Sequence, residues 1–129
     1  MSLLSILVAD DDPQVRQYLQ ITLRHLGHRI QTVADGAEAI SCIRARHFDV
    51  VLMDCHMPTV DGLTATQVIR SEPLTRQPVI LALSADVRSP NRQACLDAGM
   101  DGFISKPVRR RDLEMALQGL QRPHHSPTP

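Results

Sequence analysis

Residues 4–13 read LSILVADDDP, an almost unbroken apolar run that stops at three consecutive acids and a proline. Residues 50–54 (VVLMD) and 79–84 (VILALS) follow the same plan, because each is an apolar run of strand length that ends on one polar side chain. Strands that are buried on both faces of a parallel sheet have this nearly continuous apolar composition. The three runs therefore predict three central strands of a parallel sheet.

The segments between these strands have the periodicity of helices. Residues 13–26 place apolar side chains at steps of four, four and three along one helix face, after Asp12 as the capping residue. Two weaker strand candidates, residues 29–33 and 103–104, are interrupted by polar residues or short, which is typical of sheet edges. The other expected helices cover residues 36–46, residues 61–70, a segment that ends at Gly99, and a last segment through Leu113 and Leu120.

Five strands that alternate with five helices predict an α/β fold with a doubly wound parallel sheet. The strand order 2-1-3-4-5, a flavodoxin-like arrangement, puts the three continuous apolar runs in the centre and the weaker strands at the edges. Residues 1–122 are expected to form this domain. Residues 123–129, which are rich in proline, are expected to be a disordered tail or a linker stub.

The composition argues against several classes of protein. The 129 residues carry 14 basic and 14 acidic side chains, and this zero net charge argues against a general binder of nucleic acid or anionic membranes. Three widely spaced cysteines indicate neither a disulfide framework nor a zinc site, so we expect a reducing, cytoplasmic location. No apolar run reaches the ~18 residues of a membrane-spanning helix, so this domain is expected to make no membrane contact.

Polar side chains stand at the ends of the expected strands and define the candidate site. Ligands of such folds bind beyond the carboxyl ends of the strands, where the strand order reverses. Lys106 is the only lysine among the 14 basic residues, and it follows the fifth strand. The side chains expected to converge there are those of Asp10, Asp11, Asp54, Ser84 and Lys106.

Three carboxylates in one place need a compensating positive charge. Two like charges ~4 Å apart repel by roughly 4 kcal/mol at an effective dielectric constant near ~20. A Mg²⁺ ion takes oxygen ligands and bridges to phosphoryl groups, so it would relieve this repulsion. Lys106 adds a point charge suited to phosphate, Ser84 can donate a hydrogen bond to it, and an aspartate can act as the nucleophile. The residues therefore predict an aspartyl phosphate site.

Four blocks of sequence, in this order and spacing, resemble the receiver domain of two-component response regulators. The resemblance covers nearly all of residues 4–121 and is greatest to receiver domains attached to hybrid sensor histidine kinases. The blocks are ILVADDDP (6–13), VVLMDCHMPTVDG (50–62), LALSA (81–85) and GFISKP (102–107).

The resemblance implies a role for each acidic residue in a phosphorelay. Asp54 would accept the phosphoryl group of a phosphohistidine, with Mg²⁺ as the cofactor. Asp11 would ligate Mg²⁺ directly together with Asp54, and Asp10 would support the ion through water. The backbone carbonyl of His56 would be a further ligand, which leaves that side chain free to vary.

The resemblance also implies how the transferred group is held and sensed. Ser84 and Lys106 would bind the phosphoryl group and neutralise charge in the transition state. Phe103 would be the switch aromatic, where many members of the family have tyrosine. The Lys106–Pro107 peptide bond would be cis.

The implied partner is a histidine kinase or a histidine phosphotransfer domain. We expect it to dock over the start of the first helix, around Gln14, Val15 and Tyr18, because this surface borders Asp54. Direct contact with nucleic acid is not expected, a weak homodimer stays open, and the domain could be tethered to a membrane-bound hybrid kinase.

Three alternative functions remain open from the sequence. The segment Asp10–Asp12 contains the DxD of haloacid-dehalogenase-type phosphatases, but Pro13 and Gln14 follow it and no cap-sized insertion exists. A flavodoxin-like FMN binder would share the strand order, yet three acids would repel the phosphate of that cofactor. The third alternative is a receiver that acts as a phosphorylation-independent interaction module. Beyond its own phosphorylation and dephosphorylation, we expect no independent turnover.

Several other polar residues are expected to have structural roles. Cys55 follows Asp54 and is interpreted as a small packed residue rather than a redox centre. His25, His28 and His47 stand at the ends of elements without the spacing of metal ligands, so surface positions are expected. Residues 109–111 are three arginines that open the last helix, where a solvated face is expected.

Overall fold

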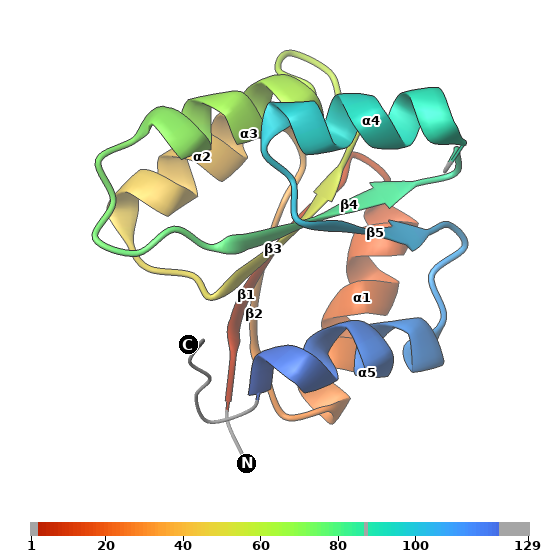
Figure 1. Cartoon of the computed structure of the whole chain (residues 1–129). Coiled ribbons are helices and arrows are strands. Elements are labelled where there is room, and N and C mark those ends of the chain that lie inside the picture. Colours follow the sequence, from red (N-terminus) through yellow and green to blue (C-terminus); the bar gives the residue numbers. More distant parts are fainter. Residues whose placement is uncertain (1–2, 87, 122–129) are drawn as a thin grey trace.

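The computed structural model describes residues 3–86 and 88–121, and its centre is a five-stranded parallel sheet (Figure 1). The strand order is β2-β1-β3-β4-β5, which confirms the predicted topology with β1, β3 and β4 inside. The tail expected at residues 123–129 lies outside the described residues. The strands are β1 (Ser5–Ala9), β2 (Arg29–Val33), β3 (Val50–Asp54), β4 (Val79–Ser84) and β5 (Gly102–Ser105).

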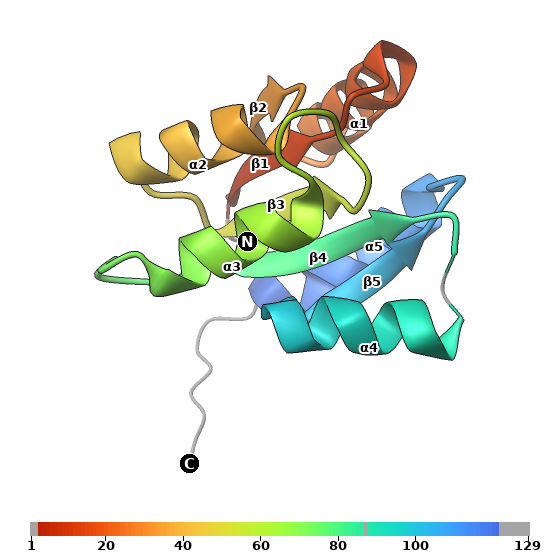
Figure 2. The same ribbon diagram turned by 90° about the horizontal axis from the view of Figure 1, so that it is seen from above.

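The helices cover both faces of the sheet. Figures 1 and 2 show α1 and α5 on one face and α2, α3 and α4 on the other, as expected for a doubly wound fold. None of the helices in the described part of the chain is long and apolar enough to cross a membrane. The helices are α1 (Pro13–His25), α2 (Gly36–Ala45), α3 (Gly62–Ser71), α4 (Ser89–Ala98) and α5 (Arg110–Gln118), and the 3₁₀ helix η1 (Gly119–Gln121) follows.

Each face of the sheet has its own hydrophobic core, because successive residues of a strand point to opposite sides. In β1, Ile6 and Val8 pack with side chains of α1 and α5. Leu7 and Ala9 of the same strand pack with side chains of α2, α3 and α4. Burial on both faces explains why the inner strands are apolar at nearly every position.

The helix and strand ends follow the sequence closely. Asp12 caps α1 by accepting a hydrogen bond from the Gln14 N–H at 2.9 Å. Gly99 follows α4 with a φ of 110°, a left-handed conformation that favours glycine. β5 is longer than the expected residues 103–104, because its backbone pairs with β4 over four residues, ending at Ser105.

The surface position predicted for His28 from the sequence is wrong. The residue is 7% exposed, and its Nδ1 accepts a hydrogen bond from the Leu4 N–H at 3.1 Å. Burial lowers the pKa of its imidazole, which favours the neutral form that this bond requires. His25 and His47 are exposed, as expected.

Candidate functional site

Three aspartates meet at the carboxyl ends of β1 and β3, as the sequence predicts. Asp54 is the last residue of β3, and Asp10 and Asp11 follow the neighbouring strand β1. One carboxylate oxygen of each lies within 4.8 Å of the others. Asp10 and Asp54 are 0% and 5% exposed, whereas Asp11 is exposed to solvent. Two of the three carboxylates are therefore removed from water and close enough to repel each other.

Lys106 brings a positive charge to this cluster from the end of β5. Its Nζ lies 2.9 Å from Asp10 Oδ2 and 3.4 Å from Asp54 Oδ1. Burial lowers the pKa of Lys106, but the interactions of its ammonium group with the two aspartates outweigh burial and raise the pKa overall. The ammonium group therefore stays protonated, and its single charge is shared between two buried carboxylates.

Asp54 is difficult to ionise in this environment. Its pKa is raised to about 6, first because burial disfavours the charged form and second because the Asp10 carboxylate is close. Lys106 and the backbone N–H of His56, which donates to Asp54 Oδ1 at 3.3 Å, oppose this rise. Any further positive charge placed at the site would favour the ionised carboxylate.

One buried oxygen of the cluster lacks a hydrogen-bond partner. Asp10 Oδ1 accepts a hydrogen bond from the Asp12 N–H at 2.9 Å. Asp10 Oδ2 is ion-paired with Lys106 but has no partner with hydrogen-bond geometry among the described residues. Carboxylate oxygens with spare lone pairs are the ligands that hard cations such as Mg²⁺ prefer. The donor set of Asp10, Asp11 and Asp54 therefore fits this ion.

Ser84 stands at the carboxyl end of β4, beside the acidic cluster. It is 2% exposed, and its Oγ donates to the carbonyl of Asp86 at 2.9 Å. The same Oγ accepts from the Asp86 N–H at 3.0 Å and from the side-chain amide of Asn91 at 3.2 Å. The hydroxyl proton is therefore engaged in the connection between β4 and α4.

Phe103 lies on β5, and β4 separates that strand from β3. Its ring is half-buried against the core under α2, α3 and α4, and the guanidinium of Arg92 lies 4.4 Å from the ring centroid. Phe103 is thus not part of the acidic cluster. The Lys106–Pro107 peptide bond is cis, in agreement with the expectation from the sequence.

A solvent-open hollow of about 400 Å³ adjoins Lys106. One wall comes from the start of α1 and the other from the loop that leads from β5 to α5. The residues around it are Asp12, Gln14, Val15, Tyr18, Lys106, Pro107, Val108 and Arg109. The three residues expected to dock a partner therefore lie together and next to the only lysine.

Sequence reasoning missed two kinds of contact at the site. Arg16 Nη1 donates to the Asp10 carbonyl at 2.7 Å and so fixes the acidic loop against α1. In the sequence, this role of Arg16 is indicated solely by its position in the first turns of the helix that follows the three acids. Asn91 and Arg92 contact Ser84 and Phe103, although no sequence motif marks either residue.

Residues 6–118 match the family described as the response regulator receiver domain. The chain belongs to this family. The match agrees with the fold, and it does not favour the phosphatase or flavin-binding alternatives. Residues 6–118 thus form a receiver domain of two-component systems.

The curated relatives of this receiver domain include sensor histidine kinases. It is 42% identical over 103 residues to the sensor histidine kinase RcsC of Escherichia coli K12. This alignment covers 80% of the present chain and 11% of RcsC. It is 33% identical over 115 residues to the sensor histidine kinase GacS of Pseudomonas protegens. This second alignment covers 87% of the present chain and 12% of GacS. The chain thus spans about a tenth of the length of these relatives.

Solved structures share the fold of this receiver domain. The receiver domain of the sensor histidine kinase PA1611 from Pseudomonas aeruginosa, with a magnesium ion in its active site cleft, is 36% identical with a TM-score of 0.84. That comparison covers 92% of this chain and 97% of the other. The chemotaxis protein CheY4 of Vibrio cholerae is 28% identical with a TM-score of 0.86, covering 92% and 98%.

Proposed function

We propose that this receiver domain accepts a phosphoryl group from phosphohistidine onto Asp54. The observation that carries the proposal is the buried Asp54 carboxylate, 3.4 Å from the only lysine and grouped with Asp10 and Asp11. In the transfer, an Asp54 oxygen attacks phosphorus. The bond between phosphorus and the histidine nitrogen breaks, and the nitrogen keeps the electron pair.

Asp10, Asp11, Asp54 and the backbone carbonyl of His56 would hold Mg²⁺ at this site. The ion would supply positive charge to the oxygens of the incoming phosphoryl group. The related PA1611 receiver, whose structure contains magnesium in its cleft, supports this assignment. Lys106 would pair with a phosphoryl oxygen, and Ser84 would donate to another after leaving Asp86.

The pKa of Asp54 sets a pH dependence for phosphoryl acceptance. Because this pKa is about 6, the carboxylate is mostly ionised at neutral pH and mostly protonated below the pKa. A protonated carboxyl is a poor nucleophile, so acceptance should fall as the pH drops through 6. Mg²⁺ should move this decline to lower pH, because added positive charge favours the carboxylate.

The partner would be a histidine kinase or a histidine phosphotransfer domain, as in the phosphorelays of hybrid kinases. We place its docking surface at the hollow around Gln14, Val15 and Tyr18, since this hollow borders Lys106. Tyr18 is 42% exposed and offers an aromatic contact there. These reactions would take place in the cytoplasm.

The proposal is tested by incubating the domain with Mg²⁺ and acetyl phosphate and measuring its intact mass. We expect one labile phosphoryl group on the native domain and none on Asp54→Asn. Asp49→Asn is the matched control, since Asp49 is a partly buried carboxylate at the opposite end of the sheet. Equal phosphorylation of Asp54→Asn and the native domain would refute the assignment of the acceptor.

A further inference from the structure

One face of α4 contacts three residues around the proposed phosphorylation site. Cys95 follows Arg92 by three positions and Asn91 by four, so its side chain neighbours both of theirs on the surface of the helix. The three side chains reach β4, β5 and the residue that follows β3. The contacts join Asn91 to Ser84 on β4, Arg92 to Phe103 on β5, and Cys95 Sγ to Cys55 Sγ, 3.5 Å away and next to Asp54.

Asn91 holds the hydroxyl of Ser84 within the connection between β4 and α4. The Asn91 amide donates to Ser84 Oγ at 3.2 Å and also to the carbonyl of Asp86. Ser84 gives its single hydroxyl proton to that same carbonyl at 2.9 Å. A serine hydroxyl has only one proton, so Ser84 has to leave Asp86 before it donates to a phosphoryl oxygen on Asp54. The contacts of Asn91 therefore stabilise the unphosphorylated arrangement.

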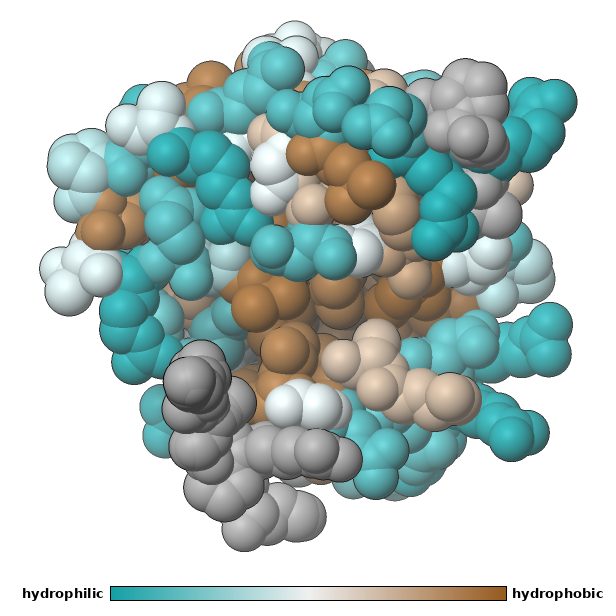
Figure 3. Space-filling view, viewed as in Figure 1, coloured by the Kyte–Doolittle hydropathy of each residue, from teal (hydrophilic) through white to brown (hydrophobic). Residues whose placement is uncertain are grey.

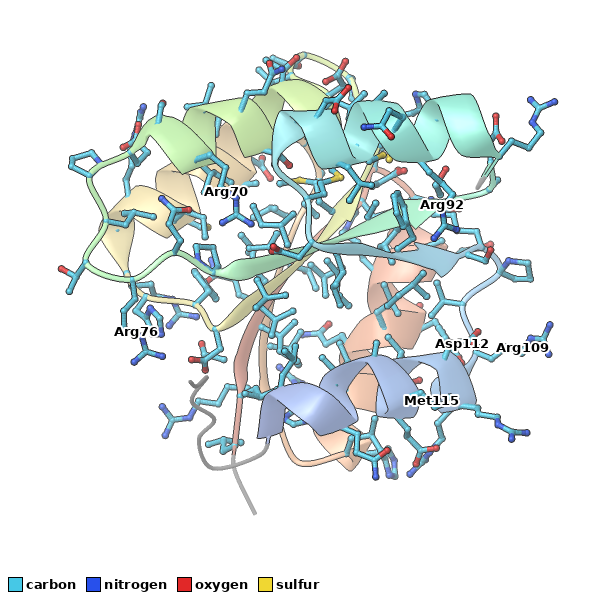
Figure 4. The ribbon with its side chains drawn as sticks, in the orientation of Figure 1. Arg70, Arg76, Arg92, Arg109, Asp112 and Met115 are labelled. Carbon is cyan, nitrogen blue, oxygen red and sulfur yellow. The ribbon has the colours of Figure 1, made fainter. Side chains whose placement is uncertain are left out.

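Arg92 covers the ring of Phe103 in the same structure. The separation of 4.4 Å between guanidinium and ring centroid is within the range of a cation–π interaction. Figure 4 shows Arg92 reaching from α4 toward β5. Figure 3 shows hydrophobic side chains gathered between α4 and α5 on this face, where a hollow is lined in part by Phe103, Ile104, Met115 and Ala116. Because Phe103 has no hydroxyl, packing and Arg92 decide where its ring lies.

We propose that Asn91 and Arg92 form a latch that restrains the response of this domain to phosphorylation. They are positioning residues: Asn91 holds Ser84, and Arg92 holds Phe103. Because they are consecutive in α4, a movement of the helix that frees one contact also disturbs the other. The inference rests on the proposed phosphoacceptor function. It adds a restraint that favours the unphosphorylated arrangement and so opposes the response to phosphorylation.

The first test measures the affinity for beryllofluoride, a stable mimic of the phosphoryl group, in the presence of Mg²⁺. Asn91→Ala should bind it about fivefold more tightly than the native domain, because an ordinary hydrogen bond of the unbound state is lost. Gln93→Ala is the matched control. Gln93 lies on the same helix, and its side chain pairs with Asp97 on the exposed surface.

The second test follows the two phenylalanine rings by NMR in the Mg²⁺-free domain. The chain contains only Phe48 and Phe103, and each lies under an arginine, since Arg46 is 4.6 Å from the Phe48 centroid. Arg92→Leu should move the Phe103 signals toward their beryllofluoride-bound positions and leave those of Phe48 in place. Arg46→Leu should move the Phe48 signals alone.

The outcomes separate the latch from the phosphoacceptor function. If the native domain neither binds beryllofluoride nor accepts a phosphoryl group, the proposed function fails, and the latch fails with it. If the native domain does both but Asn91→Ala binds beryllofluoride no more tightly than Gln93→Ala, the latch alone is refuted. Phe103 signals that move away from the bound positions in Arg92→Leu would also refute it.

Discussion

The two ends of the sheet differ in how much positive charge lies near their acidic residues. At the amino end, Asp49 accepts a hydrogen bond from the Ser5 N–H at 2.8 Å and lies 3.0 Å from His47 and 3.8 Å from Arg76. Arg76 and Arg70 are labelled at this end in Figure 4. At the carboxyl end, Asp10 and Asp54 are more deeply buried, yet they share a single lysine.

This difference has a direct effect on ionisation. Glu72, near the amino end, is bound by Arg44 through two contacts of 2.9 Å, and chiefly this hydrogen bonding lowers the pKa of Glu72. Asp54 has its pKa raised to about 6 by burial and by Asp10. Near the amino end of the sheet, acidic side chains are therefore paired with basic ones. At the carboxyl end, where we place a metal ion and a phosphoryl group, the acidic side chains have less positive charge than they need.

The largest expected effect comes from filling the space behind Asp54. A Cβ at position 62 would overlap the carbonyl oxygen of Asp54, so Gly62→Ala has to displace the end of β3. We expect a loss on the order of 3 kcal/mol in the free energy of unfolding, measured with urea. Gly119→Ala is the control, because a Cβ there meets no atom within 4 Å. Equal stability of the two variants would contradict the close packing at this end.

Lys106→Arg should damage the site without changing the net charge. Lys106 places a compact ammonium 2.9 Å and 3.4 Å from two carboxylates, and a planar guanidinium does not reproduce that position. We expect phosphorylation of Asp54 by acetyl phosphate to persist at a rate about tenfold lower. The shift of the Phe103 NMR signals on phosphorylation should be lost. A native rate and a native shift would show that the shape of the lysine is unimportant.

His28 should make stability depend on pH. Burial lowers the pKa of its imidazole in the folded state, so unfolding is accompanied by proton uptake in mildly acidic solution. The stabilisation is complete above the unfolded pKa of ~6.5 and is lost as the pH falls through the lower folded pKa. His28→Asn keeps an acceptor for the Leu4 N–H but does not titrate. Between pH ~7.5 and ~5.5 the native domain should lose more stability than this variant. Parallel pH profiles would contradict the assignment.

The smallest effect is expected at the compensated end. Arg44 and Glu72 form a well-aligned ion pair, but the Arg44 side chain is 56% exposed. Exposed ion pairs contribute little because water and salt screen them. Arg44→Ala should leave the melting temperature almost unchanged. A large fall would show that the amino end depends on its ion pairs more than the comparison implies.

The sequence predicted the sheet and the acidic cluster for the same reason. Strands buried on both faces are apolar throughout, which predicted the central strands. The residues at or just beyond the carboxyl ends of the strands, such as Asp54 and Lys106, must converge once the strand order is known. The burial of His28 was not predictable, because it depends on the N–H of Leu4, a partner distant in sequence. The contacts of Asn91 and Arg92 depend on the path of the β4–α4 connection, which local periodicity does not encode.

The central claim is that Asp54 is held in a buried, under-compensated site until Mg²⁺ arrives. It is tested most directly by the unfolding free energy of the native domain and of Asp54→Asn at pH ~7.5, with and without Mg²⁺. A raised folded pKa means that stability is lost as the pH rises through about 6, so the ionised carboxylate destabilises the native domain at this pH. Without Mg²⁺, Asp54→Asn should therefore be more stable by on the order of 2 kcal/mol. Mg²⁺ should stabilise the native domain more than the variant. A less stable variant without Mg²⁺, or equal stabilisation of both proteins by Mg²⁺, would contradict the account.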